Sequence, residues 1–232
     1  MNKPVAVHPL LVAKGLRKAF TKRGSAPIDV LQGIDITVQP GDRIAIVGKS
    51  GAGKSTLLHV LGTLEKPTEG TVHFLGQDVF TYDEENLSKF RNQQVGFVFQ
   101  FHYLMLEFTA LENVMMPALI ANHSKSQAKE KANHLLSRVG LSHRTDHKPS
   151  QLSGGEQQRV AIARSLMMSP KLLLTDEMTG NLDPITGAQV FELVQTIVSE
   201  FKQALISVTH DEAMAKTYDK VFRLTDGILK KS

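Results

Sequence analysis

Short runs of apolar, β-favouring residues recur along the chain and are separated by stretches with helical spacing. Ile34, Ile36 and Val38 alternate with polar residues, which is the period of a half-buried strand. Mainly apolar, β-favouring runs predict further strands at 11–13, 44–47, 72–75, 95–99, 172–175, 204–209, 221–224 and 228–229. Asp226-Gly227 lies between the last two runs and predicts the turn of a hairpin.

Apolar residues at helical spacing predict helices after residue 53, over 109–140, after Ser153 and around 190–197. Two of the helix starts carry the pattern of a capping box, Thr109 with Glu112 and Ser153 with Glu156. Gly140 and Pro170 are suitable ends for the helix over 125–139 and for the helix that follows Ser153. Pro40-Gly41-Asp42 predicts a turn.

Four of the apolar runs are followed directly by polar residues: Gly48 onward, Gln100, Asp176-Glu177 and His210. In an open parallel α/β sheet, ligands bind beyond the carboxyl ends of the strands. The sequence therefore predicts an α/β fold in which these four elements gather on one edge, while the strand order stays open. The strand–turn stretch at 72–78 is expected to be antiparallel.

The residues that follow the run 44–47 fit the phosphate-binding motif G-x-x-x-x-G-K-[ST]. The motif and its next residue are Gly48, Lys49, Ser50, Gly51, Ala52, Gly53, Lys54, Ser55 and Thr56. Its glycines allow several backbone N–H groups to point at one anion, and the following helix adds the positive end of its dipole. Lys54 is expected to reach the β- and γ-phosphates of a nucleotide and the Ser55 hydroxyl to bind Mg²⁺.

An acidic pair, Asp176-Glu177, supplies the other groups that nucleotide hydrolysis needs. Asp176 follows a buried strand and resembles the Walker B aspartate that holds Mg²⁺, and Glu177 is placed to polarise the attacking water. Without the phosphate-binding motif, such a pair would be interpreted as solvated carboxylates at a strand end. Gln100 and His210 are weak signals alone and gain weight from their positions after strands.

Composition narrows the classes of function. The 232 residues include no cysteine, which excludes disulfides, thiolate metal sites and a cysteine nucleophile. The 27 Lys and Arg exceed the 23 Asp and Glu only mildly, so no nucleic-acid partner is indicated. No run approaches the roughly 20 apolar residues of a membrane span, and the start of the chain lacks the apolar core of a signal peptide. We therefore expect a soluble, cytoplasmic protein that contacts a membrane only through partners.

One run resembles the signature of the ATP-binding cassette (ABC) family: Leu152-Ser153-Gly154-Gly155-Glu156-Gln157-Gln158. The other elements follow in that family's order along nearly the whole chain. The resemblance implies the ABC-ATPase version of the P-loop NTPase fold, with a RecA-like core, an antiparallel β subdomain and an α-helical subdomain. It implies ATP and Mg²⁺ as ligands and ATP hydrolysis coupled to transport. The catalytic residues would be Glu177, His210 and Gln100, and the Mg²⁺ ligands Ser55, Gln100 and Asp176.

Further ATP contacts follow from the same resemblance. Phe20 would stack on adenine, and Asp183 would act from the loop Asn181-Leu182-Asp183. Ser153 and Gly155 would contact the γ-phosphate of ATP bound to a second copy of the chain. Helix N-termini bind anions, which agrees with such a contact at Ser153. The Ser153 hydroxyl is alternatively the cap of its own helix, and the two roles are compatible.

Three runs resemble the ATP-binding subunit of the lipoprotein-releasing transporter: 99–104, 108–114 and 178–183. This resemblance implies a homodimer in the ATP-bound state beneath two integral membrane subunits, on the cytoplasmic face of the bacterial inner membrane. ATP binding and hydrolysis would power the release of lipoproteins directed to the outer membrane. The chain departs from that family at Thr175, usually Ala, and at Met178, usually Pro. Met178 is expected to change loop rigidity without loss of hydrolysis.

The stretch 101–117 is rich in Phe, Leu and Met. It is interpreted either as core of the helical subdomain or, in part, as a groove that receives a cytoplasmic helix of the membrane partner, to which Met side chains adapt well. His143 and His147 stand four apart, a helical spacing that suits a metal, but a third ligand candidate is not evident, so we expect no metal site there.

The expected organisation is a single ABC domain over residues 10–232, with a helical subdomain at about 101–168 inserted in the core, after an extension at 1–9. One alternative is the ATPase subunit of a macrolide exporter or of an FtsE-like cell-division system, although the exporter usually carries its membrane part on the same chain. A non-transport ABC ATPase is disfavoured, because the segment from Lys54 to Ser153 is too short for a long coiled coil and the chain has one cassette. A regulator that binds nucleotide without hydrolysing it is disfavoured by Glu177 and His210.

Overall fold

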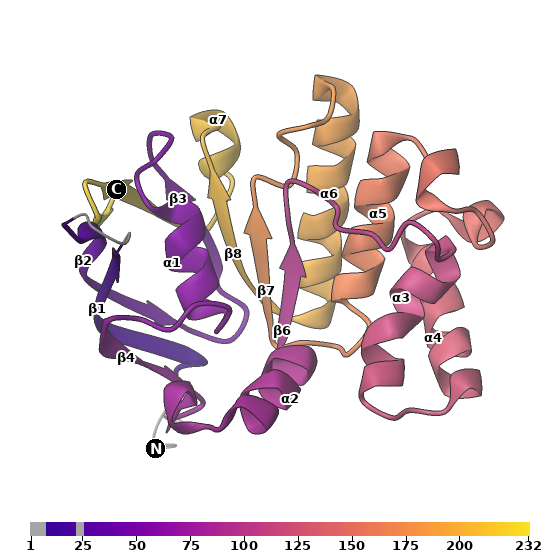
Figure 1. The fold of residues 1–232 in the computed structure, drawn as a ribbon. Helices are drawn as coiled ribbons and strands as arrows, with labels where there is room; N and C mark the ends of the chain where they lie inside the picture. The colour runs from indigo at the N-terminus through magenta and orange to yellow at the C-terminus, as the bar shows by residue number, and fades with distance from the viewer. Residues whose placement is uncertain (1–7, 22–25) are drawn as a thin grey trace, which may run out of the picture. The chain divides into compact units, whose positions relative to one another are not determined.

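The computed structural model describes residues 8–21 and 26–232 (Figure 1). Most of the expected extension at 1–9 lies outside the described residues. The chain divides into two compact units. The first unit contains residues 1–87 and 204–232, and the second unit contains residues 88–203. The chain leaves the first unit within helix α2 (Glu84–Gln94) and returns to it after Gln203.

An antiparallel sheet in the first unit has the strand order β2-β1-β4-β5. Its strands are β1 (Leu11–Phe20), β2 (Ile28–Val38), β4 (Glu69–Phe74) and β5 (Gln77–Asp78), and the 3₁₀ turn η1 (Val79–Thr81) follows. Ile34, Ile36 and Val38 are buried and alternate with exposed residues, which confirms the predicted period. β1 extends well beyond the predicted run 11–13. The sequence pattern missed the rest of the strand because a register shift between Ala13 and Leu16 interrupts the alternation of buried and exposed residues.

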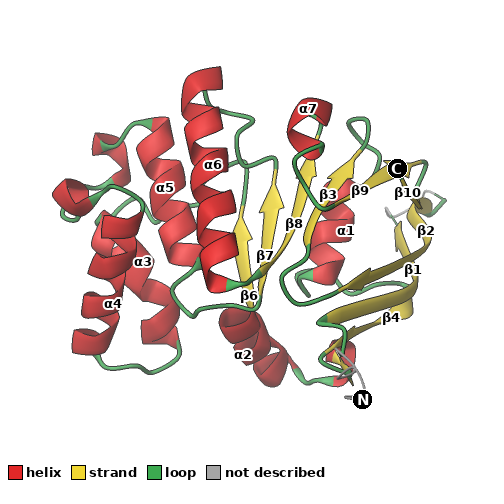
Figure 2. Cartoon of the chain, turned by 180° about the vertical axis from the view of Figure 1, so that it is seen from behind, coloured by secondary structure: helices red, strands yellow, loops and turns green. Residues whose placement is uncertain are grey.

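The remaining strands of the first unit are mainly parallel (Figure 2). β3 (Arg43–Val47) pairs in parallel with β8 (Ala204–Thr209) on one side and with β9 (Lys220–Thr225) on the other. β10 (Ile228–Lys231) pairs with β9 through the predicted turn, where Asp226 and Gly227 both have positive φ angles. Helix α1 (Lys54–Leu61) packs on β8, and the short helix α7 (Glu212–Ala215) packs on β3.

The second unit combines two parallel strands with helices (Figure 1). Its strands β6 (Val95–Val98) and β7 (Leu172–Asp176) pair in parallel. Its main helices after α2 are α3 (Ala110–Ile120), α4 (Lys125–Arg138), α5 (Gly154–Ser165) and α6 (Pro184–Phe201). Two 3₁₀ turns, η2 (Ser142–Arg144) and η3 (Pro149–Gln151), connect α4 to α5. α3, α4 and α5 pack on one another, and α5 also packs on β6 and α6.

Most predicted elements are present, and the differences have local causes. Helix α5 ends at Ser165, so Pro170 lies beyond its end, although Leu166 and Met167 are buried as the pattern requires. The sequence pattern did not reveal α2, because Leu87 is the only buried residue among those described in it. It did not reveal α7, which has four residues and is too short to show a period.

An ion pair joins the starts of two parallel strands in the first unit. The Arg43 guanidinium donates from Nη2 to Asp219 Oδ1 over 2.7 Å and from Nε to Asp219 Oδ2 over 3.1 Å. The backbone N–H of Asp219 donates to the Arg43 carbonyl over 3.0 Å. The hydrogen bond from Arg43 holds the pKa of Asp219 below its ordinary value of 3.8. This two-point contact fixes where β9 starts beside β3.

Asp219→Asn should therefore lower the free energy of unfolding at pH 7 by about 0.5–1 kcal/mol, since the pair is partly exposed. A lowered folded-state pKa gives stability that is complete above the unfolded pKa and is lost as the pH falls through the folded pKa. In urea titrations from pH 7 to pH 3, the difference between wild type and Asp219→Asn should hold down to about pH 4 and shrink below it. Asp29→Asn, an exposed carboxylate on β2, is the control; a difference independent of pH would contradict the linkage.

Candidate functional site

The predicted phosphate-binding loop lies in the first unit between β3 and α1. Gly53 is the N-cap of α1 in a left-handed conformation, with φ of 96°, which only glycine adopts readily. An added Cβ at Gly53 would lie 2.9 Å from Val30 Cγ1 and 3.0 Å from the Val30 carbonyl oxygen. The loop therefore needs glycine here both for its backbone conformation and for its close approach to β2.

The N-terminus of α1 differs in its capping from that of other helices. Within the described part of the chain, no side chain caps α1, whereas Thr109, Ser153 and Asp183 cap α3, α5 and α6. The first N–H groups of a helix need acceptors, and anions satisfy them well. The geometry of this loop fits a phosphate group.

Lys54 places a positive charge over the same loop. Its Nζ donates to the carbonyl oxygen of Gly48 over 3.0 Å and to that of Lys49 over 3.2 Å, and the residue is only 6% exposed. Lys49, Ser50, Gly51 and Ser55 are exposed around it, with Ala52 and Thr56 half-buried. The loop thus combines exposed residues with one buried lysine that is anchored by backbone carbonyls.

His210 lies at the same end of the parallel strands as the loop. Val47 of β3 is registered with Thr209 of β8, so Gly48 and His210 directly follow paired residues. His210 is exposed, and the next residue, Asp211, caps α7 through hydrogen bonds from Ala213 N and Met214 N. Two of the four predicted polar elements are therefore neighbours at one strand edge, as the sequence indicated.

Phe20 is the last residue of β1 and is 42% exposed. The Lys18 Nζ lies 4.9 Å from the centroid of its ring. A half-exposed ring suits stacking against a planar ligand, so the predicted contact with adenine remains a prediction that this position permits.

The other two elements are neighbours in the second unit. Val98 of β6 is registered with Thr175 of β7, so Gln100 and the pair Asp176-Glu177 lie at the same ends of paired parallel strands, with Asp176 as the last residue of β7. Asp176 and Glu177 are both half-buried, and Thr175 is buried. Hydroxyl and amide oxygens together with a carboxylate are ligands that Mg²⁺ accepts, so the types of residue predicted to hold the ion fit it.

Glu177 has an unusual backbone conformation. Its φ angle is +43°, in the left-handed region, which costs a non-glycine residue on the order of 1–3 kcal/mol. The turn is held by a hydrogen bond from Gly180 N to the Glu177 carbonyl oxygen over 2.9 Å, and Met178 is buried beside it. Such strain persists where the surrounding structure imposes it, often at functional residues.

The signature run begins at the N-terminus of α5. Glu156 N donates to Ser153 Oγ over 3.3 Å and Ser153 N donates to Glu156 Oε2 over 2.8 Å, which confirms the predicted capping box. The hydrogen bond from the Ser153 backbone is the main reason that the pKa of Glu156 is lowered, and Arg144 Nε contributes from 3.0 Å. Ser153 and Gly154 are exposed, so this helix start is accessible.

Asp183 likewise caps a helix. Its Oδ1 accepts hydrogen bonds from Ile185 N and Thr186 N, both over 3.1 Å, at the start of α6. Hydrogen bonds from Thr186 lower the pKa of Asp183. The residues Ser153 and Asp183 therefore have structural roles that do not need a nucleotide.

The stretch 101–117 divides between the two interpretations. Phe101, Tyr103 and Leu106 are more than half exposed, whereas Val114 and Met115 are buried. A groove of about 240 Å³ lies in the second unit, lined by Asn92, Val95, Gly96, Phe97, Phe99, Pro117, Arg164, Ser165 and Met168. The buried residues of the stretch belong to the core, and Pro117 at its end borders this groove.

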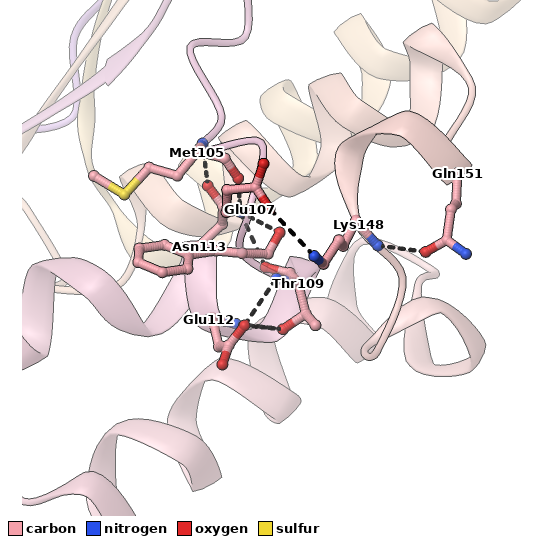
Figure 3. A network of polar contacts seen from close by, with 8 residues as sticks. Met105, Glu107, Thr109, Glu112, Asn113, Lys148 and Gln151 are labelled. Atoms are coloured by element: carbon pink, nitrogen blue, oxygen red, sulfur yellow. Dashed lines mark hydrogen bonds and ion pairs between the residues drawn. The ribbon is translucent and has the colours of Figure 1, made fainter.

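The segment that follows Gln100 is anchored at its far end to α3 (Figure 3). Asn113 is buried and exchanges hydrogen bonds with both backbone groups of Met105: Met105 N donates over 2.8 Å, and Asn113 Nδ2 donates to the carbonyl over 3.1 Å. Beside it, Thr109 and Glu112 form the predicted capping box. The sequence analysis gave Asn113 no role beyond its place in the run 108–114, and its local signal was a polar residue on an apolar helix face.

His143 and His147 do not share an α-helix, since His143 lies in η2 and His147 lies beyond it. Because no α-helix contains both residues, their spacing of four does not place the two side chains on one helix face. Among the described residues, no group of three or more His, Cys, Asp or Glu is arranged to hold a metal ion.

Comparisons with known proteins agree with this geometry. The family described as ABC transporter matches residues 31–180. The lipoprotein-releasing system ATP-binding protein LolD of Geobacter metallireducens is 54% identical to this chain, over 94% of the chain and 96% of the relative. The protein of the same name from Legionella pneumophila is 49% identical, over 95% of the chain and 96% of the relative.

Solved structures share the fold. A dimeric post-hydrolysis structure of the ATP-binding cassette MJ0796, bound to ADP and Pi, has a TM-score of 0.87 and 36% identity, covering 96% of this chain and 97% of that one. CbiO1 from Clostridium perfringens, part of the ABC transporter complex cbiONQ, has a TM-score of 0.83 and 28% identity, covering 96% and 87%. The expected α/β fold of ABC ATPases is confirmed. No helix in the described ranges has both the length and the apolar character that a membrane crossing requires.

Gly155→Ala tests why the signature contains a buried glycine. An added Cβ would lie 2.4 Å from Thr186 Cγ2 on α6, so overpacking should lower stability by about 1–3 kcal/mol. Thr186→Ser removes that methyl group and keeps the hydroxyl, so the double variant should recover most of the loss. Thermal unfolding measures both.

The matched control is Gly154→Ala, whose Cβ would lie 3.6 Å from Leu182 Cδ2 at an ordinary contact distance. It should change stability little. Equal losses in the two alanine variants would contradict the packing explanation.

Proposed function

The chain belongs to the ABC transporter family, and we propose that its described loops bind MgATP and hydrolyse it to power the release of lipoproteins by a membrane complex. The observation that carries this function is about 50% identity to lipoprotein-releasing ATP-binding proteins over nearly the whole chain. The chain is therefore an ATP-hydrolysing ABC subunit of the lipoprotein-releasing type. The residue roles below are proposed from the geometry of each unit.

We assign phosphate binding to the loop at Gly48–Thr56. Its backbone N–H groups and the uncapped start of α1 surround the phosphates, and Lys54 contributes its charge to the β- and γ-phosphates. Since Lys54 is already held over the loop by two carbonyls, it needs little reordering to bind an anion. Phe20 stacks on the adenine ring.

We assign the chemical step to the loops that follow β6 and β7. Glu177 accepts a proton from, or polarises, the water that attacks the γ-phosphorus, and ADP is the leaving group. Ser55, Gln100 and Asp176 would hold Mg²⁺, which when bound neutralises charge on the phosphates. His210 acts as the switch residue that responds to the terminal phosphate.

We propose that hydrolysis requires a homodimer. Ser153 is exposed at the start of α5, where a helix N-terminus favours an anion, and Gly155 and Asp183 belong to the same proposed interface. Each signature would face the ATP held by the other copy. The dimeric state of the solved cassette MJ0796 with ADP and Pi supports this assembly.

We propose that two integral membrane subunits are the partners, which would keep the chain peripheral on the cytoplasmic face of the inner membrane. The groove bordered by Phe97, Phe99, Pro117 and Met168 is the proposed docking site for a cytoplasmic helix of such a subunit. Its lining combines aromatic, aliphatic and thioether surface with the cation of Arg164. A single domain over 10–232, with the helical insertion at about 101–168, remains our proposed division.

The alternative transport systems are not favoured. The relatives at 54% and 49% identity both carry the name of the lipoprotein-releasing protein, over nearly their whole lengths. Neither a macrolide exporter nor a cell-division ATPase is supported by these relatives.

Glu177→Gln tests the chemical step. Replacing the carboxylate removes the acceptor for the water proton, so ATP hydrolysis should fall at least about 100-fold while ATP binding persists. Hydrolysis is measured as phosphate release, and binding by a fluorescent ATP analogue. The control is Glu192→Gln, which changes an exposed carboxylate on α6. Hydrolysis near the wild-type rate in Glu177→Gln would remove Glu177 from the role of base.

Ser153→Ala and Lys54→Ala together test the two-copy site. Ser153→Ala should leave ATP binding by the isolated chain nearly intact and lower hydrolysis at least about tenfold, because its anion contact is to ATP on the other copy. Lys54→Ala should weaken both. Ser124→Ala is the matched control: Ser124 caps α4 as Ser153 caps α5, so each loses a cap worth about 1 kcal/mol. A signature variant that binds ATP as poorly as Lys54→Ala would contradict the two-copy site.

A further inference from the structure

The backbone on both sides of Gln100 is fixed by helix α5. Before it, Gln158 Nε2 donates to the Phe99 carbonyl oxygen over 3.3 Å, from a side chain that is fully buried. After it, Arg164 donates from Nη2 to His102 O over 2.7 Å and from Nη1 to Tyr103 O over 2.6 Å. The loop position is therefore set by α5, and the orientation of the Gln100 side chain has to be set by something else.

That contact comes from Asn181, which lies 81 residues later in the chain. Gln100 Nε2 donates to Asn181 Oδ1 over 3.1 Å, and Asn181 Nδ2 donates to the Gln100 carbonyl oxygen over 3.1 Å. The neighbouring Gly180 leaves room for the pair, since an added Cβ there would lie 3.0 Å from Gln100 Nε2. One asparagine thus contacts both the backbone and the side chain of the same glutamine.

The chemistry of this pair determines which way the Gln100 amide points. A backbone carbonyl oxygen only accepts hydrogen bonds, so the Asn181 group that faces it has to be Nδ2. Asn181 Oδ1 then faces the Gln100 side chain, and an oxygen there requires a donor, which is Nε2. The opposite end of the Gln100 amide is Oε1, the oxygen that a cation would bind. A reversed amide would place two oxygens against each other.

We propose that Asn181 is a positioning residue that orients the Gln100 amide with its oxygen toward Mg²⁺. This rests on the proposed role of Gln100 as a ligand of the ion. Asn181 also lies on the loop between β7 and α6 that begins with Glu177, so the loop that carries the proposed base orients the proposed metal ligand. A change in this loop, for example on docking of a second copy, is thereby transmitted to the amide of Gln100.

The test measures how Mg²⁺ affects nucleotide binding, in the full chain carrying Glu177→Gln so that hydrolysis does not interfere. A fluorescent ATP analogue is titrated at a series of Mg²⁺ concentrations and in EDTA. Asn181→Ala should raise the Mg²⁺ concentration for half-maximal effect about 5–10-fold and leave binding in EDTA unchanged. Asn181→Asp sets an oxygen against the Gln100 carbonyl but keeps an acceptor for Gln100 Nε2. This variant should therefore raise the Mg²⁺ concentration for half-maximal effect by a smaller factor than Asn181→Ala does.

Gln100→Ala calibrates the assay, because removing the amide should raise the Mg²⁺ requirement at least as much. Adding Asn181→Ala to Gln100→Ala should then cause no further rise. Asn133→Ala, an exposed amide on α4, should match the parent, and thermal unfolding checks that the variants are folded.

Three outcomes overturn the proposal, and they can be told apart. If Gln100→Ala raises the Mg²⁺ requirement and both Asn181 variants keep the parental value, the role of Asn181 is refuted while Gln100 stays a metal ligand. A parental requirement in Gln100→Ala refutes Gln100 as a metal ligand and, with it, the reason for orienting its amide. Additive effects of Gln100→Ala and Asn181→Ala would likewise refute a role of Asn181 through Gln100.

Discussion

Parallel strand pairing decides where each candidate functional residue of this chain lies. Neighbouring parallel strands end at the same edge, so the residues that follow them become neighbours whatever their separation in sequence. Val47 and Thr209 are registered in the first unit, and Val98 and Thr175 are registered in the second. The residues that follow these registered pairs include the phosphate-binding motif and His210 in one unit, and Gln100 and the acidic pair in the other. A shift of one residue in either register would change which side chains reach their edge.

The N-termini of the helices also carry candidate functional residues, and they are capped in two different ways. At α1 the cap position is a glycine, which gives up about a few tenths of a kcal/mol relative to a side-chain cap. The N–H groups of that first turn are then suited to an anionic ligand. At α5 and α6 the caps are Ser153 and Asp183, so those helices are stable without a ligand. The same two residues are proposed to act at the nucleotide of a second copy.

The sequence predicted what short-range patterns determine. The capping boxes at Thr109 and Ser153, the turn at Asp226-Gly227 and the buried run of β8 all depend on residues within a few positions of one another. Contacts between distant segments were not predictable in this way. The burial of Gly155 against Thr186 and the pairing of Gln100 with Asn181 depend on how α6 and its preceding loop pack, which no local period encodes. Helix α2 was missed for a different reason. Its surface is mostly polar, and its apolar stripe is too narrow to show a helical period in the sequence.

Three separate restraints act on the loop from Glu177 to Asp183. Its first residue is held in a left-handed conformation, its Asn181 bonds the Gln100 loop, and its last residue caps α6. The strain at Glu177 is tolerated because the buried Met178 and the turn to Gly180 leave this loop little freedom. The resemblance to the lipoprotein-releasing family led us to expect proline at the position of Met178, and in this chain the buried methionine restricts the loop by packing. Because the loop is restrained at its start, middle and end, we expect the proposed base Glu177 and the proposed metal ligand Gln100 to shift together.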